Sequence, residues 1–527
     1  MKKIKELNLG FTDAQIYSQR KNKAMFNDIF VKNLYLDELV QHSKFFLIGE
    51  KGTGKTAYAT FLSNGEYYNT KSVLKFLSST DYDKFYILKE QKNLDLTGYT
   101  SIWKVIILLL FADSISNDSS SVATFNKSSI GELNKAINEY YQNAFAPNIM
   151  TALKVIEQSN LFASLLSKHI EAGGNSSKTI EFLETKFQTN LLYIEKQFIE
   201  AISKIRLTKD MILFIDGIDI RPDNIPYSDY IECIRGLANA TWSLNTEVFQ
   251  NMKGKGNCKT VLLLRPDIYN SLSLQNATNK LLDNSVYLDW RTTYRGYKKS
   301  YLYNVAKKIL SYDNERSELC DDELWNAYFP WKIRSTNEEE REFDTAFMSF
   351  LRISLSRPRD ILVILQYLQK LMLRNDLGES LKFSFEEFNS NEFQNSYSTY
   401  FMGSLKDQLL FYYSSIDFQH FLKFFDYFHN TDFSYKTYLD NYEKFIEYIC
   451  NNASDIPAFM EEPKKLLQLL YDSNVIAAID NGRTKPYFYF SYREKDISNI
   501  NPQVPVEDNI TYRFHYGMYK KAEFGRF

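Results

Sequence analysis

Four short apolar runs stand out in the first part of the chain. They lie at 44–48, 211–215, 260–264 and 285–290. Runs dominated by apolar residues over this length are typical of parallel strands that are buried on both faces of a sheet. A further strand is expected either at 71–77 or at 84–90, where β-branched and aromatic residues concentrate, and the pattern does not choose between the two.

Helical periodicity fills the segments between these runs. It is longest from 102 to about 207, where polar loops at 117–121 and 172–177 interrupt it. We interpret 102–207 as a helical insertion. Strands that alternate with helices predict a doubly wound α/β domain with a parallel sheet.

Beyond Trp290 the pattern is helical until the last part of the chain. There, Lys464–Asp480 has the pattern of a helix that leads into a strand, and a second strand pattern follows the pair Asn481-Gly482. Asn-Gly is a strong signal for a type I′ hairpin turn. Helix, strand, hairpin and strand together predict a winged-helix-like end to the chain.

Length and charge narrow the class of protein. The 527 residues exceed the roughly 250–300 residues at which a single core stops growing, so several domains are expected. Lys and Arg number 63 against 65 Asp and Glu, for a net charge of -2. This balance argues against a polycation that coats nucleic acid, although a local basic face is compatible with it.

No segment has the pattern of a membrane span. The longest apolar run, 105–112, is far shorter than the roughly 20 residues that a spanning helix needs, and no apolar region follows the basic N-terminal residues. We therefore expect a cytoplasmic protein without a membrane partner. The four cysteines lie far apart without a CxxC pair, which indicates free thiols and no structural zinc.

The first apolar run ends directly in GEKGTGKT, residues 49–56, which is a complete Walker A motif. Because a strand enters this loop and a helix leaves it, backbone N–H groups and the helix dipole can face a phosphate. Lys55 is expected to neutralise phosphate oxygens, and the Thr56 hydroxyl to bind Mg²⁺. The sequence thus predicts a site for ATP and Mg²⁺ formed by Gly49, Glu50, Lys51, Gly52, Thr53, Gly54, Lys55, Thr56 and Ala57.

The second long apolar run ends in Asp216, which suits a Walker B aspartate that holds Mg²⁺ through water. The next position is Gly217, where most AAA+ proteins have a glutamate. Asp219 is the nearest following acid and the candidate that orients the attacking water. The alternative is that Asp219 only caps a turn.

Arginines add further candidates. Arg265 follows an apolar strand and could detect the γ-phosphate at the carboxyl edge of the sheet, or it could pair with Asp267. Arg357 and Arg359, beside Pro358 at the start of an amphipathic helix, could reach the nucleotide from a lid or be ordinary solvated or interdomain arginines.

Two features near the C-terminus are ambiguous. His515 lies among aromatic and basic residues, a setting in which a packed histidine is more common than a catalytic one. Arg483, Lys485 and Arg493 are interleaved with aromatic residues and could face DNA, although alternating aromatics more often mark one buried strand face.

Motifs along nearly the whole chain resemble a family of bacterial P-loop ATPases akin to STAND and origin-recognition-type AAA+ proteins. They are FNDIFVKN, FFLIGEKGTGKTA, FIDGIDIRP, LLLRPDIY, SRPRDIL and FHYGMYKKAEFG, in this order. The resemblance implies a C-terminal winged helix, Arg265 as sensor 1, and a role in antiviral (phage) defence. The DGID sequence is similar to the Walker B of NACHT-type STAND proteins, which implies slow hydrolysis.

These observations predict a fold and four regions. The fold class is α/β, with an ASCE/AAA+-like P-loop NTPase sheet and a helical insertion, followed by a helical lid and a winged-helix domain. The regions are an N-terminal segment at 1–42 that packs on the core, the P-loop ATPase domain at 43–290, the lid at 291–405 and the winged-helix-like domain at 406–527.

The leading hypothesis is a slow or partner-stimulated ATPase that acts as a molecular switch, with Lys55, Asp216, Asp219 and Arg265 in the reaction. A protein partner or a second copy of the chain would receive its signal. The alternative is an ATP-dependent DNA-binding initiator or loader that works through its winged helix. A small-molecule kinase is a weaker hypothesis, because no acceptor-site motif is present.

Overall fold

The computed structural model describes residues 1–78, 82, 96–117, 121–122, 129–135, 184–312, 314, 319–332, 345–453, 455–482, 486–496, 499 and 501–520. The chain forms two compact units. We call Leu34–Glu50 with Lys55–Leu288 the parallel-sheet unit, and Met1–Asn33 with Lys51–Gly54 and Asp289–Phe527 the helical unit. Each is described by itself.

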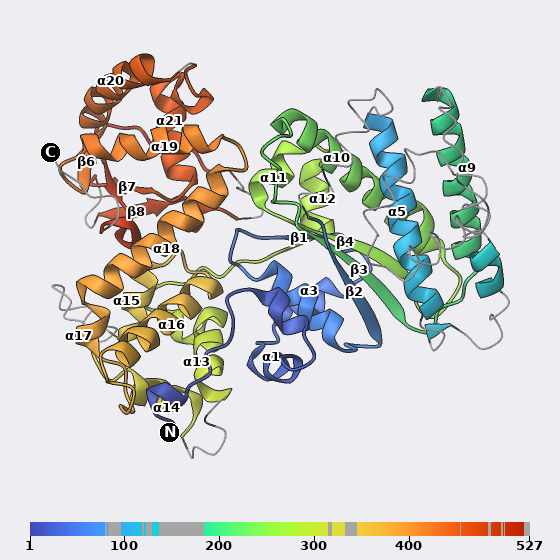
Figure 1. Cartoon of the computed structure of the whole chain (residues 1–527), viewed down its shortest axis with the longest axis horizontal. Helices are drawn as coiled ribbons and strands as arrows, with labels where there is room; N and C mark the ends of the chain where they lie inside the picture. Colours follow the sequence, from blue (N-terminus) through green and yellow to red (C-terminus); the bar gives the residue numbers. More distant parts are fainter. Residues whose placement is uncertain are drawn as a thin grey trace, which may run out of the picture. The chain divides into compact units, whose positions relative to one another are not determined.

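Five parallel strands form the sheet of the first unit (Figure 1). They are β1 (Phe46–Ile48), β2 (Thr70–Phe76), β3 (Asp210–Asp216), β4 (Cys258–Leu264) and β5 (Ser285–Tyr287), in the spatial order β2-β3-β4-β1-β5. The residues of β4 are all buried, as are those of β3 after Asp210. The predicted α/β class with a parallel sheet is confirmed. Of the two candidates for the additional strand, 71–77 lies in β2, and 84–90 lies outside the described residues.

Helices cover both faces of this sheet because the chain changes direction across it. From β1 to β2 the chain passes through α3 (Lys55–Asn64) in one direction, and from β3 to β4 it passes through α10 (Tyr227–Ser243) in the other. Right-handed crossovers place helices of opposite direction on opposite faces. The connection continues as η6 (Leu244–Val248) and η7 (Phe249–Asn251), and α11 (Pro266–Ser271) and α12 (Ala277–Asn284) lead from β4 to β5.

The helical insertion is described in part, as α5 (Leu96–Asn117) and α9 (Glu184–Ser203), so helix begins a few residues before 102. Within α5, Tyr99–Ser116 is the one window in the described chain that is long and apolar enough to cross a membrane. Most of this window is buried, and α5 packs between α10 and α9 (Figure 1). This packing is that of a buried core helix.

The N-terminal segment divides between the two units. Helix α2 (Leu34–Leu39) belongs to the parallel-sheet unit, where the ammonium group of Lys259 donates to the carbonyls of Leu39 at 2.6 Å and Gln41 at 2.5 Å. Burial lowers the pKa of Lys259 to about 7. This lysine ties the end of α2 to β4.

Residues 1–33 belong instead to the helical unit, whereas the sequence analysis placed all of 1–42 on the core. They contain η1 (Ile4–Glu6), η2 (Ala14–Ser18) and α1 (Lys23–Ile29). The side-chain amide of Gln369 donates to the carbonyls of Ile4 and Leu7, at 2.8 and 2.7 Å. Gln369 therefore satisfies two backbone carbonyls of this segment within the helical unit. The apolar pattern of the sequence gives no sign of such contacts.

The middle of the helical unit consists of helices. They are η8 (Tyr297–Lys299), α13 (Tyr301–Tyr312), α14 (Asp321–Tyr328), α15 (Ala346–Ile353), α16 (Pro358–Arg374), α17 (Phe385–Phe388) and α18 (Asn391–Leu409). Helix α18 is continuous, so a domain boundary at residue 405 would fall inside it.

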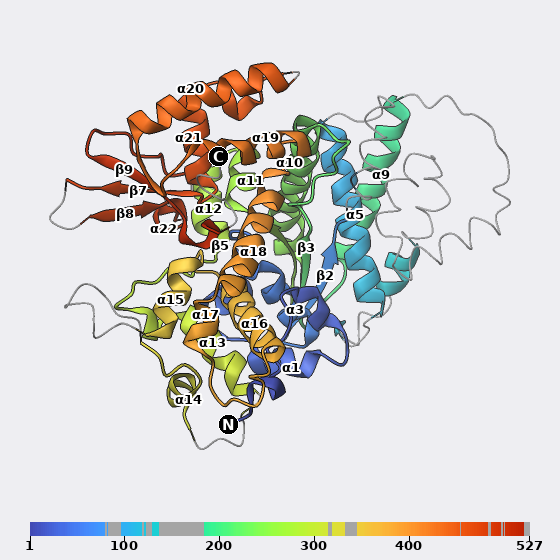
Figure 2. The same ribbon diagram turned by 60° about the vertical axis from the view of Figure 1, so that its left-hand side comes forward.

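The C-terminal part combines helices with a four-stranded antiparallel sheet in the order β6-β9-β7-β8 (Figure 2). Its elements are α19 (Ser415–Lys423), η10 (Phe424–Tyr427), β6 (Asp432–Ser434), α20 (Tyr435–Asn452), η11 (Ala458–Met460), α21 (Pro463–Asp472), β7 (Ile476–Asp480), β8 (Tyr487–Phe490), α22 (Ser491–Glu494), β9 (Ile510–Phe514) and η12 (Tyr516–Met518).

The predicted hairpin between β7 and β8 is present, but its turn is not of type I′. The strands pair antiparallel from Ala477 with Phe490 to Asp480 with Tyr487. Gly482 lacks the positive φ that a type I′ turn requires, and the connection is longer than two residues. Instead, Gly482 N–H donates to the Asp480 carboxylate at 2.9 Å. The described start of the connection therefore has a side-chain bond where Asn-Gly suggested a two-residue turn.

Candidate functional site

Three strand ends meet at the carboxyl edge of the parallel sheet. β4 lies between β1 and β3, with Ile48 opposite Leu264 and Ile215 opposite Leu262. The loop after β1, Asp216 at the end of β3, and Arg265 after β4 therefore lie along one edge. Ligands of open parallel α/β sheets bind at this edge.

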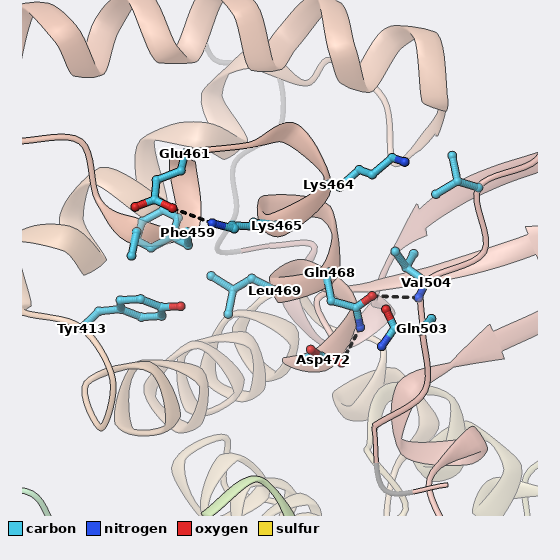
Figure 3. A pocket seen from close by; sticks show the side chains of 12 residues that line it. Tyr413, Phe459, Glu461, Lys464, Lys465, Gln468, Leu469, Asp472, Gln503 and Val504 are labelled. Carbon is cyan, nitrogen blue, oxygen red and sulfur yellow. Dashed lines mark hydrogen bonds and ion pairs between the residues drawn. The ribbon is translucent and has the colours of Figure 1, made fainter. Parts of the chain in front are cut away.

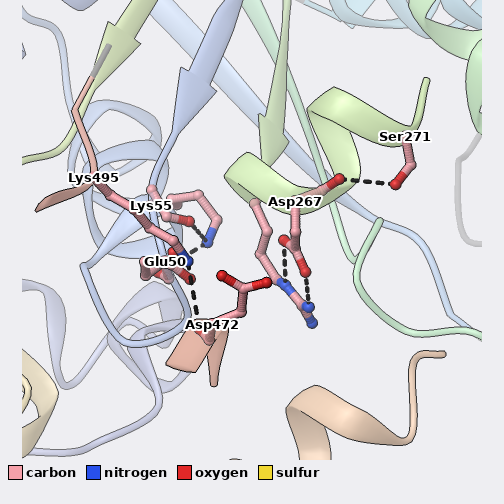
Figure 4. A network of polar contacts seen from close by, with 8 residues as sticks. Glu50, Lys55, Asp267, Ser271, Asp472 and Lys495 are labelled. Carbon is pink, nitrogen blue, oxygen red and sulfur yellow. Dashed lines mark hydrogen bonds and ion pairs between the residues drawn. The ribbon is translucent and has the colours of Figure 1, made fainter. Parts of the chain in front are cut away.

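Lys55 is the first residue of α3 and is buried. Its ammonium group donates to the carbonyl of Gly49 at 2.8 Å and of Glu50 at 3.3 Å (Figure 4). Burial lowers the pKa of Lys55, and the charges of Asp219 and then Asp216 oppose this shift. A buried ammonium group beside the loop is suited to receive anionic oxygens.

The next residue, Thr56, is tied to the end of β3. Its hydroxyl donates to Asp216 Oδ2 at 2.5 Å, and the other carboxylate oxygen accepts from Gly217 N–H at 2.8 Å. Burial raises the pKa of Asp216, and the nearby charge of Asp219 adds to the rise, while the Thr56 hydrogen bond opposes it. A hydroxyl and a buried carboxylate are oxygen donors of the kind that Mg²⁺ takes, so the residues fit this ion.

Gly217 directly follows Asp216, at the end of β3. Its φ is +86°, and a Cβ atom added there would lie 2.2 Å from the carbonyl oxygen of Leu77. Leu77 N–H in turn donates to the Asp216 carbonyl at 2.9 Å. Only glycine fits this close approach of two backbones, which is a physical reason for the DG sequence.

Asp219 is half-buried and close enough to Lys55 and Asp216 to act on the pKa of each. Two tyrosines hold the loop that carries it. Tyr82 donates to the Gly217 carbonyl at 3.3 Å, and Tyr230 donates to the Ile218 carbonyl at 2.7 Å. Tyrosine hydroxyls therefore hold two successive carbonyls of the loop between Asp216 and Asp219.

Arg265 is almost fully buried, at 1% exposure, and its guanidinium forms a bidentate pair with Asp267 (Figure 4). The Nε–Oδ1 distance is 3.0 Å. Arg265 acts on the pKa of Lys55 and so lies near the predicted site. Of the two sequence alternatives, the ion pair is the one that the structure contains.

The tip of the glycine loop, Lys51–Gly54, makes its contacts within the helical unit. Gly52 and Gly54 have φ values of +89° and +94°, which only glycine adopts readily. The Lys51 carbonyl accepts from Arg357 Nη1 at 2.8 Å. The Gly52 carbonyl accepts from the backbone N–H of Arg359 at 3.3 Å, and the Thr53 carbonyl from Trp290 Nε1 at 2.8 Å.

Arg357 is itself held by a buried carboxylate. Its Nε and Nη2 atoms donate to the two oxygens of Asp360, at 3.0 and 2.9 Å. Asp360, 1% exposed, also accepts from Tyr400 at 2.8 Å and from Leu355 N–H at 2.9 Å. The start of α16 and the middle of α18 are thus joined at one charge pair.

His515 and Arg493 have structural partners. His515 is buried, stacks on Phe401 with ring centroids 4.9 Å apart, and accepts from Gly517 N–H at 3.1 Å. The Arg493 guanidinium lies over the rings of Phe490 and Tyr492. The packed interpretation of His515 is confirmed, and Arg483 and Lys485 lie outside the described residues.

An open pocket of about 770 Å³ lies along α21 in the helical unit (Figure 3). Its polar side chains bind one another: Lys465 pairs with Glu461 at 2.5 Å, and Gln468 donates to Asp472 at 2.8 Å. The pocket contains none of the residues that the sequence assigned to nucleotide, and its volume alone does not indicate a function.

Within the described part of the chain, no three His, Cys, Asp or Glu residues cluster as metal ligands. None of the four cysteines is in a disulfide bond; Cys233 and Cys258 are buried, and Cys320 and Cys450 are exposed. Comparison with protein-family models, with curated proteins and with solved structures gives no match to the chain.

The structure therefore brings together Lys55, Thr56, Asp216, Asp219 and Arg265 in the parallel-sheet unit, and places Arg357 and Arg359 against the loop tip in the helical unit. The sequence analysis missed Trp290, Tyr82 and Tyr230. The only available signal was that Trp290 ends the last predicted parallel strand, because the hydrogen bonds of these residues join segments far apart in sequence.

Proposed function

We propose that this protein is a P-loop NTPase of the ASCE/AAA+-like division that binds ATP with Mg²⁺, hydrolyses it slowly, and acts as a cytoplasmic molecular switch. The observation that carries the proposal is the Thr56–Asp216 hydrogen bond, which joins the glycine loop to the end of β3. A strand inserted between the two motif strands, here β4, is what the ASCE arrangement requires.

Each residue at the edge has a role in this proposal. Lys55 neutralises phosphate oxygens, and Thr56 and Asp216 hold Mg²⁺ directly and through water. Bound Mg²⁺ would supply charge neutralisation at the phosphates and would favour the ionised form of Asp216, whose pKa is raised without it. Asp219 orients the attacking water.

Arg265 has its guanidinium on Asp267 and so needs to leave or share this partner to act as sensor 1. An exposed surface pair would exchange easily, but the burial of the guanidinium strengthens this one, although Asp267 is partly exposed. Together with Gly217 in place of the AAA+ glutamate, this favours slow turnover that a partner accelerates.

The test is ATP binding and turnover of the wild type and of Lys55→Ala. Calorimetry should give a clear wild-type affinity that the substitution lowers severely, because the buried ammonium group is lost. Asp216→Ala should keep part of the binding and lose Mg²⁺-dependent turnover. Equal nucleotide affinity in wild type and Lys55→Ala would refute the phosphate-site assignment.

The C-terminal part is interpreted as winged-helix-like, so DNA is the alternative partner. DNA-stimulated turnover with strongly salt-dependent binding would favour an initiator or loader, and turnover indifferent to DNA would favour the switch. Antiviral defence rests on the resemblance alone, and phage plating efficiency on cells with and without Lys55→Ala tests it.

A further inference from the structure

We propose that Arg357 and Trp290 are positioning residues of the phosphate-binding loop: they hold its peptide groups in place and do not themselves bind nucleotide. The inference deepens the proposed function and rests on it, because it concerns the same loop. It departs from the expectation that Arg357 contacts the nucleotide from a lid.

The first observation is the capture of three consecutive carbonyls. Those of Lys51, Gly52 and Thr53 each accept one hydrogen bond, from the Arg357 side chain, the Arg359 backbone and the Trp290 indole. Three successive peptide groups are thus fixed at their oxygen ends.

Because the peptide group is rigid, fixing its carbonyl also fixes the direction of its N–H group. A trans peptide is planar, and its N–H points opposite to its C=O. Fixing the carbonyls of Lys51, Gly52 and Thr53 therefore directs the N–H groups of Gly52, Thr53 and Gly54 away from Arg357 and Trp290. Successive N–H groups that converge form a concavity that binds anions.

These three hydrogen bonds reduce the conformational entropy that the loop loses when a phosphate binds. Gly52 and Gly54 both have positive φ, and glycine loses more backbone freedom on ordering than any other residue. A loop that is already ordered does not pay this entropy when a phosphate binds. Trp290, 7% exposed, and Arg357, also 7% exposed, are rigidly placed for the task.

Arg357 has the partners of a positioning residue. Nε and Nη2 are on Asp360 and Nη1 is on the Lys51 carbonyl, so each guanidinium nitrogen has an acceptor. Because Asp360 is buried, removing the arginine outright would leave an uncompensated charge and endanger folding. Arg357→Lys keeps the charge and loses the fork that reaches both partners.

Trp290→Phe is the sharper variant, because it removes one N–H donor and keeps an aromatic ring. Trp331→Phe is its matched control: Trp331 lies in the same unit, and its Nε1 atom makes no hydrogen bond with the described residues. Two measurements apply to each variant: the calorimetric affinities for ATP·Mg²⁺ and ADP·Mg²⁺, and the rate of tryptic cleavage after Lys51 without nucleotide.

We expect Trp290→Phe to weaken ATP and ADP by the same factor, about fivefold for one hydrogen bond. Cleavage after Lys51 should become faster by a similar factor, because proteolysis follows the population of the released loop. Arg357→Lys should act in the same direction on both nucleotides. Trp331→Phe should change neither measurement.

If Arg357→Lys weakened the binding of ATP but not that of ADP, the inference would be overturned, because the guanidinium would then contact the γ-phosphate. Unchanged cleavage and affinity in Trp290→Phe would overturn it as well. If the wild type binds no nucleotide, the proposed function fails, and the cleavage rates without nucleotide still decide whether Trp290 and Arg357 hold the loop.

Discussion

Asp216 is a carboxylate kept in a place that favours its neutral form. Burial and the charge of Asp219 raise its pKa, so its burial costs stability: the cost grows as the pH rises from the ordinary pKa of 3.8 to the raised value, and it is complete above that value. The Thr56 and Gly217 hydrogen bonds offset part of this cost. An ion that binds the carboxylate would relieve the rest.

Asp216→Asn keeps the shape and removes the charge. At pH 7 and without ligands, we expect the variant to unfold at a higher temperature than the wild type, by roughly 2–4 °C for each 1 kcal/mol relieved. The difference should fade as the pH falls below the ordinary pKa of 3.8, because Asp216 is then protonated in the folded and unfolded chains. Scanning calorimetry at several pH values measures this, and a lower midpoint at pH 7 would contradict the argument.

Asp219 decides between an enzyme and a passive binder. Asp219→Asn should leave ATP affinity nearly unchanged and lower the turnover rate by roughly 10²–10⁴-fold, the usual contribution of a positioned general base. A phosphate-release assay with calorimetric affinities separates the two effects. Wild-type turnover in the variant would make Asp219 a turn residue, and no turnover in the wild type, even with DNA or a partner, would leave binding or exchange as the switch.

At the scale of elements, the Walker B loop is shaped by the approach of two backbones. Gly217→Ala should destabilise the protein by about 2 kcal/mol or more, because it adds a Cβ at positive φ and 2.2 Å from the Leu77 carbonyl. Gly65→Ala is the matched control, since a Cβ there meets nothing within 4 Å. Thermal unfolding of the two variants compares their stabilities. Equal midpoints would show that the Leu77 backbone shifts to make room for the added Cβ without a measurable loss of stability.

The parallel strands could be predicted from the sequence, whereas the hairpin turn and the attachment of the N-terminal segment could not. The apolar runs that became β1, β3, β4 and β5 are visible in the sequence because both faces of each strand are buried. The predicted type I′ turn at Asn481-Gly482 is wrong: Gly482 lacks the positive φ that it requires, and its N–H donates to the Asp480 carboxylate. The attachment of residues 1–33 to α16 rests on hydrogen bonds that leave no periodic signal.

In the candidate site, too, some residues could be predicted from the sequence and others could not. The Walker A spacing made Lys55 and Thr56 predictable, and the strand end made Asp216 predictable. Trp290, Tyr82 and Tyr230 act through single hydrogen bonds to backbone carbonyls, and a carbonyl belongs to every residue, so the sequence gives no sign of which one is chosen.

At the scale of the molecule, each unit has its own buried core, and we expect two unfolding transitions in calorimetry. Tyr512→Ala, at a fully buried position of β9, should lower one of them by about 3 kcal/mol or more in stability. Val261→Ala, in β4, should lower the other. Parallel shifts of both transitions in either variant would show that the units unfold together.

The central position of β9 also has a consequence for synthesis. The parallel-sheet unit has all its segments once Leu288 has left the ribosome, whereas the C-terminal sheet waits for Phe514 to place β9 between β6 and β7. At about 5–20 residues per second, this delay is roughly ten to fifty seconds. Residues 1–33, which are made before the parallel-sheet unit, wait until α16 is complete at Arg374 for the helices that they pack on, so they find their place only after the whole parallel-sheet unit has been made.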